Sequence, residues 1–288
     1  MRIAIVGDVH GHLALMYAVL GRWQRESGRS IDLVLQLGDM GAFLPTSRLD
    51  SATKRHAERD PEELGFSEFA GDSPPPTLLD PRPPLVFIPG NHEDFEFLEE
   101  CERRAPADDA VYPVSQDGRI SALHSGRIWS FSSGDERLRI AGVSGVARRR
   151  EKTSRHPRYH LSEEDALALA SAGPGAFDIL ISHDGPEGAI ESYRGTPSAS
   201  PELRLVIEEA RPAFAFFAHY GKTGEWTIGR TRVYALGGCG YVPRESWPLQ
   251  QGGFVLLERT PAGVFVERLS PEWLGKSNRH NWRHWGRP

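Results

Sequence analysis

Short apolar runs recur along the first three quarters of the chain, and each ends where polar residues begin. Runs of this kind, rich in β-branched and aliphatic residues, are typical of buried strands. We expect strands at residues 3–6, 33–37, 85–88, 139–143, 179–181 and 214–217. Helical patterns lie between several of them, at residues 13–25, 94–103, 163–170 and 202–210. The alternation predicts an α/β layered fold.

The pattern changes after Gly221 to segments of alternating polar and apolar residues, separated by Gly or Pro. Alternation with a period of two predicts antiparallel strands. We place them at residues 226–230, 232–236, 253–258 and 264–269, and expect a second sheet that packs on the first.

Two segments depart from this rhythm: one lies within an expected domain at residues 1–270, and the other follows that domain. Residues 42–84 are polar and rich in proline, too long for an ordinary connection, and predict an insertion that covers or borders the functional site. Residues 271–288 form a basic, aromatic tail. We expect the tail to be mobile or folded onto an apolar groove, with stacking on unpaired bases as the alternative.

Composition excludes several classes of protein. The hydrophobic fraction of 39% fits a folded chain, and no apolar run is long enough to span a bilayer. Met1 leads directly into the first apolar run without an export signal, and two cysteines are too few for a disulfide framework. We therefore expect a cytoplasmic protein without membrane partners. The net charge of −5 leaves room only for a local polyanion site.

Metal-capable side chains follow nearly every predicted strand of the α/β part. Ligands converge at the carboxyl ends of strands in such folds, so these residues predict one shared site. Each motif alone is equally well explained as a turn. Together they are G-D-V-H at 7–10, G-D-M at 38–40, G-N-H-E at 90–93, S-H-D at 182–184 and A-H-Y-G at 218–221.

The order of these motifs resembles the calcineurin-like metallophosphoesterase superfamily. The resemblance implies a four-layer αββα sandwich, with two packed mixed sheets flanked by helices, and a metal-dependent phosphoesterase. Residues 140–145, the basic stretch that follows, and residues 182–186 are locally similar to the RNA-lariat debranching branch. We expect phosphodiester hydrolysis by a metal-activated water. The alternatives are a non-catalytic interaction module, a phosphomonoesterase and a protein phosphatase.

The resemblance also implies residue roles. His92 is expected to be free of metal and to orient the phosphate or protonate the leaving group. Carboxylate, imidazole and amide donors suit Mn, Fe or Zn, and two such ions can clamp a phosphoryl group. The implied ligands are Asp8 and His10 for one ion, Asn91, His183 and His219 for the other, and Asp39 between them.

One ligand of the superfamily pattern is missing, because Gly221 stands where the second histidine of G-H-x-H is expected. The ion at Asp8 and His10 is therefore expected to bind weakly. Two carboxylates that follow implied ligands, Glu93 and Asp184, are expected to hydrogen-bond to them or to begin helices. We interpret His12 as structural and Cys239 as a buried thiol.

A dense basic run follows the predicted strand at 139–143. Arg148, Arg149 and Arg150 are its candidate substrate-binding residues, and three further cations at 152, 155 and 158 continue it. The run either binds a nucleotide or nucleic-acid substrate through counterion release or is a solvated loop.

Overall fold

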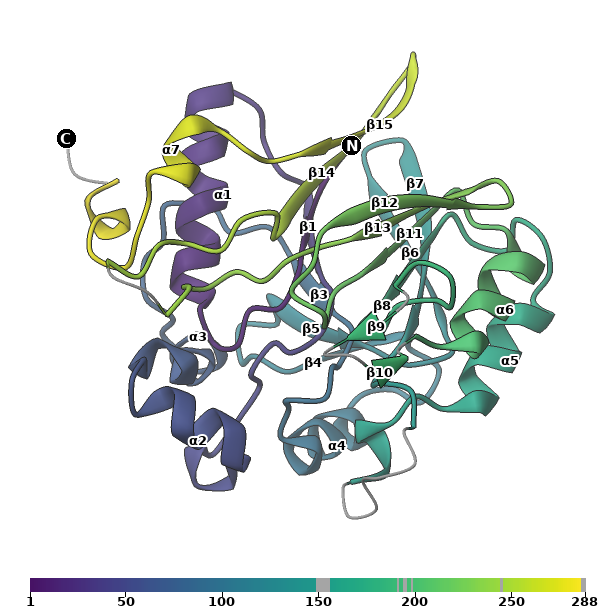
Figure 1. Ribbon diagram of the computed structural model, residues 1–288, viewed down its shortest axis with the longest axis horizontal. Coiled ribbons are helices and arrows are strands. Elements are labelled where there is room, and N and C mark those ends of the chain that lie inside the picture. Colours follow the sequence, from purple (N-terminus) through teal and green to yellow (C-terminus); the bar gives the residue numbers. More distant parts are fainter. Residues whose placement is uncertain (149–155, 191, 194–195, 198, 244–245, 286–288) are drawn as a thin grey trace.

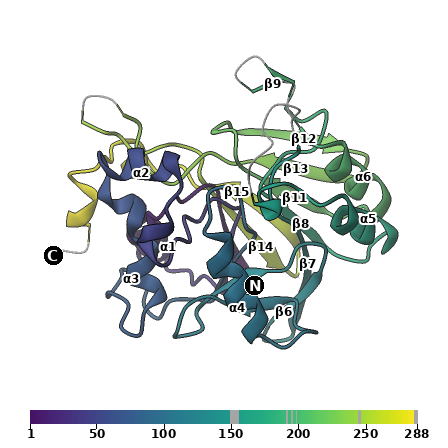
Figure 2. The same ribbon diagram turned by 90° about the horizontal axis from the view of Figure 1, so that it is seen from below.

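Two mixed β-sheets face each other in the middle of the molecule, and helices cover their outer faces (Figure 1). The computed structural model describes residues 1–148, 156–190, 192–193, 196–197, 199–243 and 246–285. Seen from below, α1, α2 and α3 lie on one side of the strands and α5 and α6 on the other (Figure 2). This is the αββα sandwich that the sequence predicts.

The first sheet has seven strands in the order β15-β14-β1-β2-β3-β5-β4. Strands β1, β2, β3 and β5 are parallel, whereas β14 runs antiparallel to β1 and both edge strands are antiparallel to their neighbours. The bounds are β1 Arg2–Val6, β2 Leu33–Gln36, β3 Leu85–Phe87, β4 Val111–Pro113, β5 Ile120–Leu123, β14 Phe254–Thr260 and β15 Gly263–Arg268.

The second sheet has six strands in the order β12-β13-β11-β8-β7-β6. Strands β7, β8, β11 and β13 are parallel, and β6 and β12 are antiparallel edges. The bounds are β6 Ile128–Ser133, β7 Glu136–Val143, β8 Ile179–Ser182, β11 Phe214–Phe217, β12 Gly224–Ile228 and β13 Thr231–Ala235. A small separate hairpin joins β9, Ser192–Tyr193, to β10, Thr196–Pro197.

The assignment of strands to sheets differs from the expectation. The antiparallel strands after Gly221 do not form a sheet of their own, because β12 and β13 extend the six-stranded sheet while β14 and β15 extend the seven-stranded one. Strand β14 pairs with β1 from Arg2↔Glu258 to Val6↔Phe254. A period of two predicts a strand with one buried face, but it does not identify the pairing partner.

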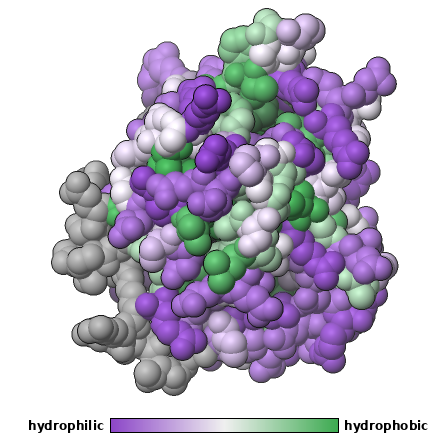
Figure 3. Space-filling model, turned by 90° about the vertical axis from the view of Figure 1, so that its right-hand side faces the viewer, coloured by the Kyte–Doolittle hydropathy of each residue, from purple (hydrophilic) through white to green (hydrophobic). Residues whose placement is uncertain are grey.

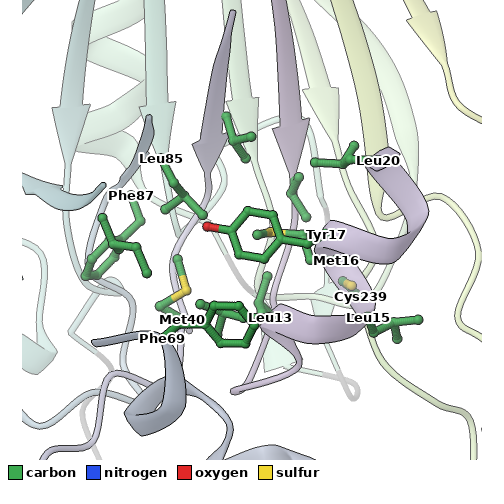
Figure 4. Packing of buried hydrophobic residues seen from close by; sticks show 14 of the residues in the cluster. Leu13, Leu15, Met16, Tyr17, Leu20, Met40, Phe69, Leu85, Phe87 and Cys239 are labelled. Atoms are coloured by element: carbon green, nitrogen blue, oxygen red, sulfur yellow. The ribbon is translucent and has the colours of Figure 1, made fainter. Parts of the chain in front are cut away.

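Apolar residues fill the three interfaces between the four layers. Ile3 and Ile5 of β1 meet Ile179 and Ile181 of β8 between the sheets. On the outer face of the seven-stranded sheet, α1, Leu13–Ser27, packs Met16, Tyr17 and Leu20 against the strands (Figure 4). Helices α3, Phe66–Ala70, and α4, Phe95–Arg104, complete that layer.

Helices α5, Glu163–Ser171, and α6, Pro201–Ala210, cover the six-stranded sheet. Their solvent side is mostly hydrophilic with scattered apolar patches (Figure 3). Both helices begin at a serine whose side chain accepts a backbone N–H three residues on, and Pro201 occupies the first turn of α6. The four helices expected from the sequence are confirmed to within two residues at each end.

The proline-rich segment at 42–84 contains short helices: η1 Thr46–Arg48, α2 Ser51–Ala57, η2 Pro61–Leu64 and α3. Phe66, Phe69 and Leu79 are fully buried in the core beside α1. The segment also packs on the loop after β1, since a Cβ added to Gly11, at φ +80°, would lie 2.1 Å from the carbonyl oxygen of Glu63. The segment is therefore polar in overall composition, but several of its apolar side chains are buried in the core.

The C-terminal residues fold back onto α1 and onto the 42–84 segment. They include α7, Glu272–Gly275, and η4, Trp282–His284. Trp282 is buried and donates a 2.6 Å hydrogen bond to the hydroxyl of Tyr241. Arg22 of α1 lies over the ring of Trp273, 4.4 Å from its centroid. Among the described residues, no helix has the length and apolar character needed to cross a membrane.

Candidate metal centre

The carboxyl ends of five parallel strands from both sheets meet at one place. Two groups of donor atoms lie there, each with all its atoms within 4.8 Å of one another. Asp39 belongs to both groups. The groups are Asp8, His10 and Asp39 from the seven-stranded sheet, and Asp39, His183 and His219, of which the two histidines come from the six-stranded sheet.

His183 is fully buried, and its orientation is fixed by hydrogen bonds. Nδ1 lies 2.9 Å from the carbonyl oxygen of Leu37, which can only accept, so Nδ1 carries the proton. Nε2 then points toward Asp39 Oδ1 at 3.3 Å and Asn91 Oδ1 at 3.2 Å. This backbone contact sets the tautomer in which Nε2 can coordinate an ion.

Asp39 is held at the centre by the loop that carries Asn91 and His92. The backbone N–H groups of Asn91 and His92 donate to Oδ1 at 2.7 and 2.8 Å. Oδ2 faces His10 Nε2 at 3.8 Å. The approach of the two loops requires Gly90, because an added Cβ would lie 2.2 Å from the amide nitrogen of Asp39.

The electrostatics of the centre favour a positive charge. Burial raises the pKa of Asp8 to about 7. Burial also acts to raise the pKa of Asp39, but the neighbouring His183 outweighs it and holds that pKa well below its usual range. Burial alone would lower the pKa of His183, yet Asp39 raises it to about 10. Buried carboxylates beside imidazoles and an amide therefore fit borderline divalent ions.

The two donor groups differ in exposure. The side chain of His10 is 33% exposed, whereas that of His183 is 0% exposed. Gly221 lies in a left-handed conformation at φ +60°, with no atom within 4 Å of the position that a Cβ would occupy. The Asp8 and His10 side is thus the more open one, and a Cβ at position 221 would meet no neighbouring atom.

Three candidate ligands adopt left-handed backbone conformations. The φ angles are +43° at His10, +52° at Asp39 and +67° at His219. For residues other than Gly this conformation costs about 1–2 kcal/mol each, and such residues cluster at functional sites. This backbone strain supports a functional role for the site, and the residue types alone do not reveal it.

His92 lies beside the centre but belongs to neither donor group. Its ring is 5.7 Å from that of His10, and its Nδ1 is 2.7 Å from Asp50 Oδ2. Burial lowers the pKa of His92, but Asp39 and Asp50 outweigh it and raise the pKa to about 9. Burial would raise the pKa of Asp50, but the bond to His92 lowers it to about 2.

The sequence interpretation missed Asp50. It lies in the 42–84 segment, far from every motif, and its local signal is that of the residue that begins α2. Only the packing of this segment beside the centre brings its carboxylate to His92.

The other neighbouring side chains brace loops. Glu93 accepts from the backbone N–H groups of Met40 at 2.9 Å and Ala42 at 2.8 Å. Asp184 accepts from the N–H of Ala147 at 2.7 Å and from the hydroxyl of Tyr220. Neither begins a helix, and both accept hydrogen bonds from the loops around the ligands.

His12 and Cys239 are both buried, and a buried thiol is what the sequence predicts for Cys239. The ring nitrogens of His12 lie 2.9 Å from the carbonyl oxygen of Val9 and 3.1 Å from Asp60 Oδ2. Burial raises the pKa of the Cys239 thiol. The backbone N–H of Cys239 donates to the carbonyl oxygen of Asp8 at 2.6 Å, so both residues support the loop of Asp8 and His10.

The basic run begins at the rim of the centre. Arg148 is exposed and follows Ala147, whose N–H binds Asp184. Arg149 and Arg150, with residues 152 and 155, lie outside the described residues. Arg158 forms ion pairs with Glu99 at 3.2 Å and Glu102 at 2.5 Å on α4. Arg158 is therefore engaged within the protein.

Comparison with known proteins identifies the family. The sequence model of the calcineurin-like phosphoesterases matches residues 1–221, so the chain belongs to this family. It is a metallophosphoesterase, a hydrolase of phosphoric esters that uses divalent metal ions.

Curated relatives include lariat debranching enzymes. The protein from Arabidopsis thaliana is 25% identical, over 98% of this chain and 69% of its own length. The one from Drosophila melanogaster is 24% identical, over 76% of this chain and 42% of its own length. The chain thus matches less than half the length of the fly relative.

Solved structures share the fold at low identity. A dimetal phosphatase from Danio rerio is 13% identical with a TM-score of 0.50, over 94% of this chain and 99% of its own. GAP50, the anchor in the inner membrane complex of Plasmodium, is 12% identical with a TM-score of 0.52, over 94% and 84%. These likenesses concern the fold alone.

Proposed function

We propose that this protein hydrolyses phosphodiester bonds in a nucleotide or nucleic-acid substrate, with two divalent ions at the centre around Asp39. The observation that carries the proposal is the position of Asp39, whose carboxylate belongs to both donor groups. A carboxylate between two groups can hold two ions close enough to share one phosphoryl group. The lariat debranching enzymes among the relatives favour a diester over a monoester.

The donor set defines the proposed ligands. Asp8 and His10 hold one ion, Asn91, His183 and His219 the other, and Asp39 both. This mixture of oxygen and nitrogen donors favours Mn, Fe or Zn. When bound, such ions supply Lewis-acid chemistry, because they polarise phosphoryl oxygens and lower the pKa of water.

His92 is the proposed proton donor to the leaving oxygen. Its Nδ1 is engaged by Asp50, so the proton available to the substrate is the one on Nε2. The raised pKa of about 9 keeps the ring protonated near neutral pH in the absence of bound ions. Asp50 is then a positioning residue, which fixes the ring and stabilises its charge.

The basic run is the last part of the proposed substrate-binding site. Arg148, with Arg149 and Arg150 next in sequence, is proposed to hold the phosphates that flank the scissile one. Arg148 follows the residue that binds Asp184, the neighbour of His183, so the run starts at the edge of the centre. The cytoplasmic location expected from the sequence stays a prediction.

A panel of diester and monoester substrates tests this function. The protein is stripped with a chelator and reloaded separately with Mn, Fe, Zn or Mg. We expect hydrolysis of nucleotide diesters only after reloading, at rates well above those on the matching monoesters. Metal-dependent hydrolysis of monoesters alone would replace the proposal with a phosphomonoesterase, and no hydrolysis with any ion would favour the non-catalytic module.

A further inference from the structure

A cavity of about 300 Å³ opens beside the donor group of Asp8 and His10. Its walls come from three parts of the chain: the loop after β1, the 42–84 segment, and the residues that follow β13. Ligand pockets start at about this volume, so there is room for one small ring system and not for an extended polymer. Asp8 and His10 also line the cavity, so it is continuous with the proposed reaction centre and extends away from it.

Two aromatic side chains that the proposed reaction does not use line this cavity, Tyr241 and Trp247. Both are held in place from outside. The hydroxyl of Tyr241 donates to Glu62 at 2.7 Å and accepts from Trp282, while Arg279 lies 5.2 Å from the ring centroid of Trp247. Fixed aromatic rings bind flat rings with little loss of side-chain freedom.

Glu63, which also lines the cavity, provides an independent observation. Its side chain is 11% exposed, and its Oε2 atom is buried without a hydrogen-bond partner among the described residues. The other oxygen, Oε1, lies 3.5 Å from Nδ1 of His56. A buried oxygen without a partner costs free energy, so Glu63 would be stabilised if its carboxylate turned to a ligand N–H group in the cavity.

We propose that this cavity is a nucleobase subsite. It takes the base of the nucleoside next to the scissile phosphate, with Tyr241 and Trp247 in contact with the ring and Glu63 accepting a hydrogen bond from a base N–H. This inference rests on the proposed function, because the diester must lie at the neighbouring centre. It adds that the substrate is recognised by a base as well as by its phosphates.

The test compares three diesters that differ only at one nucleoside: guanosine, its C-phenyl analogue, and an abasic ribose. The phenyl ring can stack but has no N–H donor, whereas guanine has two adjacent donors. Non-hydrolysable phosphonate analogues of the three are titrated into the metal-loaded protein by calorimetry, and the cleavable forms are assayed in parallel. Binding and turnover are thereby measured separately.

We expect the guanine analogue to bind at least about 10-fold more tightly than the abasic one, with the phenyl analogue between them. Trp247→Leu should reduce the advantage of both rings over the abasic ligand by about 10-fold. Glu63→Gln should reduce mainly the advantage of guanine over phenyl, also by about 10-fold. Trp129→Leu, on β6 of the six-stranded sheet, is the matched control. This variant should bind the three analogues in the same order of affinity as the wild-type protein.

Equal affinities of the wild-type protein for the guanine and abasic analogues would overturn the subsite. Tighter binding of phenyl than of guanine would assign the cavity to an apolar group and overturn the role of Glu63. If base-dependent binding holds while no cleavable diester is hydrolysed, the proposed function fails and the subsite stands.

Discussion

Asp50 accepts a hydrogen bond from His92 at 2.7 Å across 42 residues of sequence, and this bond links the 42–84 segment to the candidate metal centre. The other oxygen of Asp50 accepts the backbone N–H groups of Ala52 and Thr53, both at 2.8 Å. The carboxylate is therefore fixed by the first turn of its own helix before it meets the imidazole. The helix α2 thus acts as a support for His92.

Asp50→Asn should move the alkaline limb of the rate profile to lower pH. The protonated form of His92 exists below its pKa, and removal of the negative charge lowers that pKa from its raised value of about 9. Bound ions lower the pKa in both proteins, so the comparison is the difference between them. The kcat profile of the variant should shift by about one pH unit or more.

The asparagine side chain can still accept the two N–H groups that begin α2, so the fold is preserved. Asp108→Asn, at an exposed carboxylate, is the control and should show the wild-type profile. An alkaline limb that stays in place in Asp50→Asn would contradict the role of the pair.

His92→Ala should lower kcat by about 10²–10⁴-fold on a substrate with a poor leaving group. The loss should shrink for an activated leaving group, which needs no proton. The metal content should stay close to that of the wild type, because His92 belongs to neither donor group. Loss of metal together with activity would show that His92 is a ligand.

The strand and helix pattern predicts much of the α/β part because buried parallel strands and amphipathic helices have distinct local signals. Asp8, Asp39 and His183 each follow such a strand, and the rule that strand ends converge brings them together. Residues 111–133 were not recognised as strands: β4 has one buried residue and ends in proline, Ser121 interrupts the apolar run of β5, and β6 has no fully buried residue.

Long-range contacts could not be predicted. No local signal connects Asp50 to His92 or Asp60 to His12, since each contact depends on how the 42–84 segment packs. The left-handed backbone conformation of His10 could not be predicted from the sequence either, because it depends on the neighbouring loops.

Reversing the charge of Arg148, Arg149 and Arg150 to Glu should raise KM for a nucleic-acid substrate and flatten its dependence on salt. Fewer counterions are released when fewer cations meet phosphates. A small chromogenic diester should be nearly unaffected. Arg230→Glu, at an exposed position after β12, is the control for a single charge reversal outside the basic run. Equal losses on both substrates would assign the run to folding or to the metal centre.

Gly221→His should tighten the ion held by Asp8 and His10. The Cβ position is free, and the φ of +60° lies in the left-handed region, at a cost of about 1–2 kcal/mol. Gly221→Ala is the matched control, since it has the same backbone cost without the imidazole. After dialysis, the histidine variant should retain more metal than either the wild type or the alanine variant. Equal retention by the three proteins would contradict the ligand count.

The most direct test of the central claim is the metal content of Asp39→Asn, measured by elemental analysis after equilibration with Mn²⁺ and gel filtration. If Asp39 holds both ions, the variant loses both and its hydrolysis of a nucleotide diester collapses, whereas His183→Ala mainly loses the ion of its own donor group. Asp117→Asn, at a surface carboxylate bound to Arg82, controls for the loss of charge and should match the wild type. Retention of both ions by Asp39→Asn, or diester hydrolysis at the wild-type rate, would contradict the account.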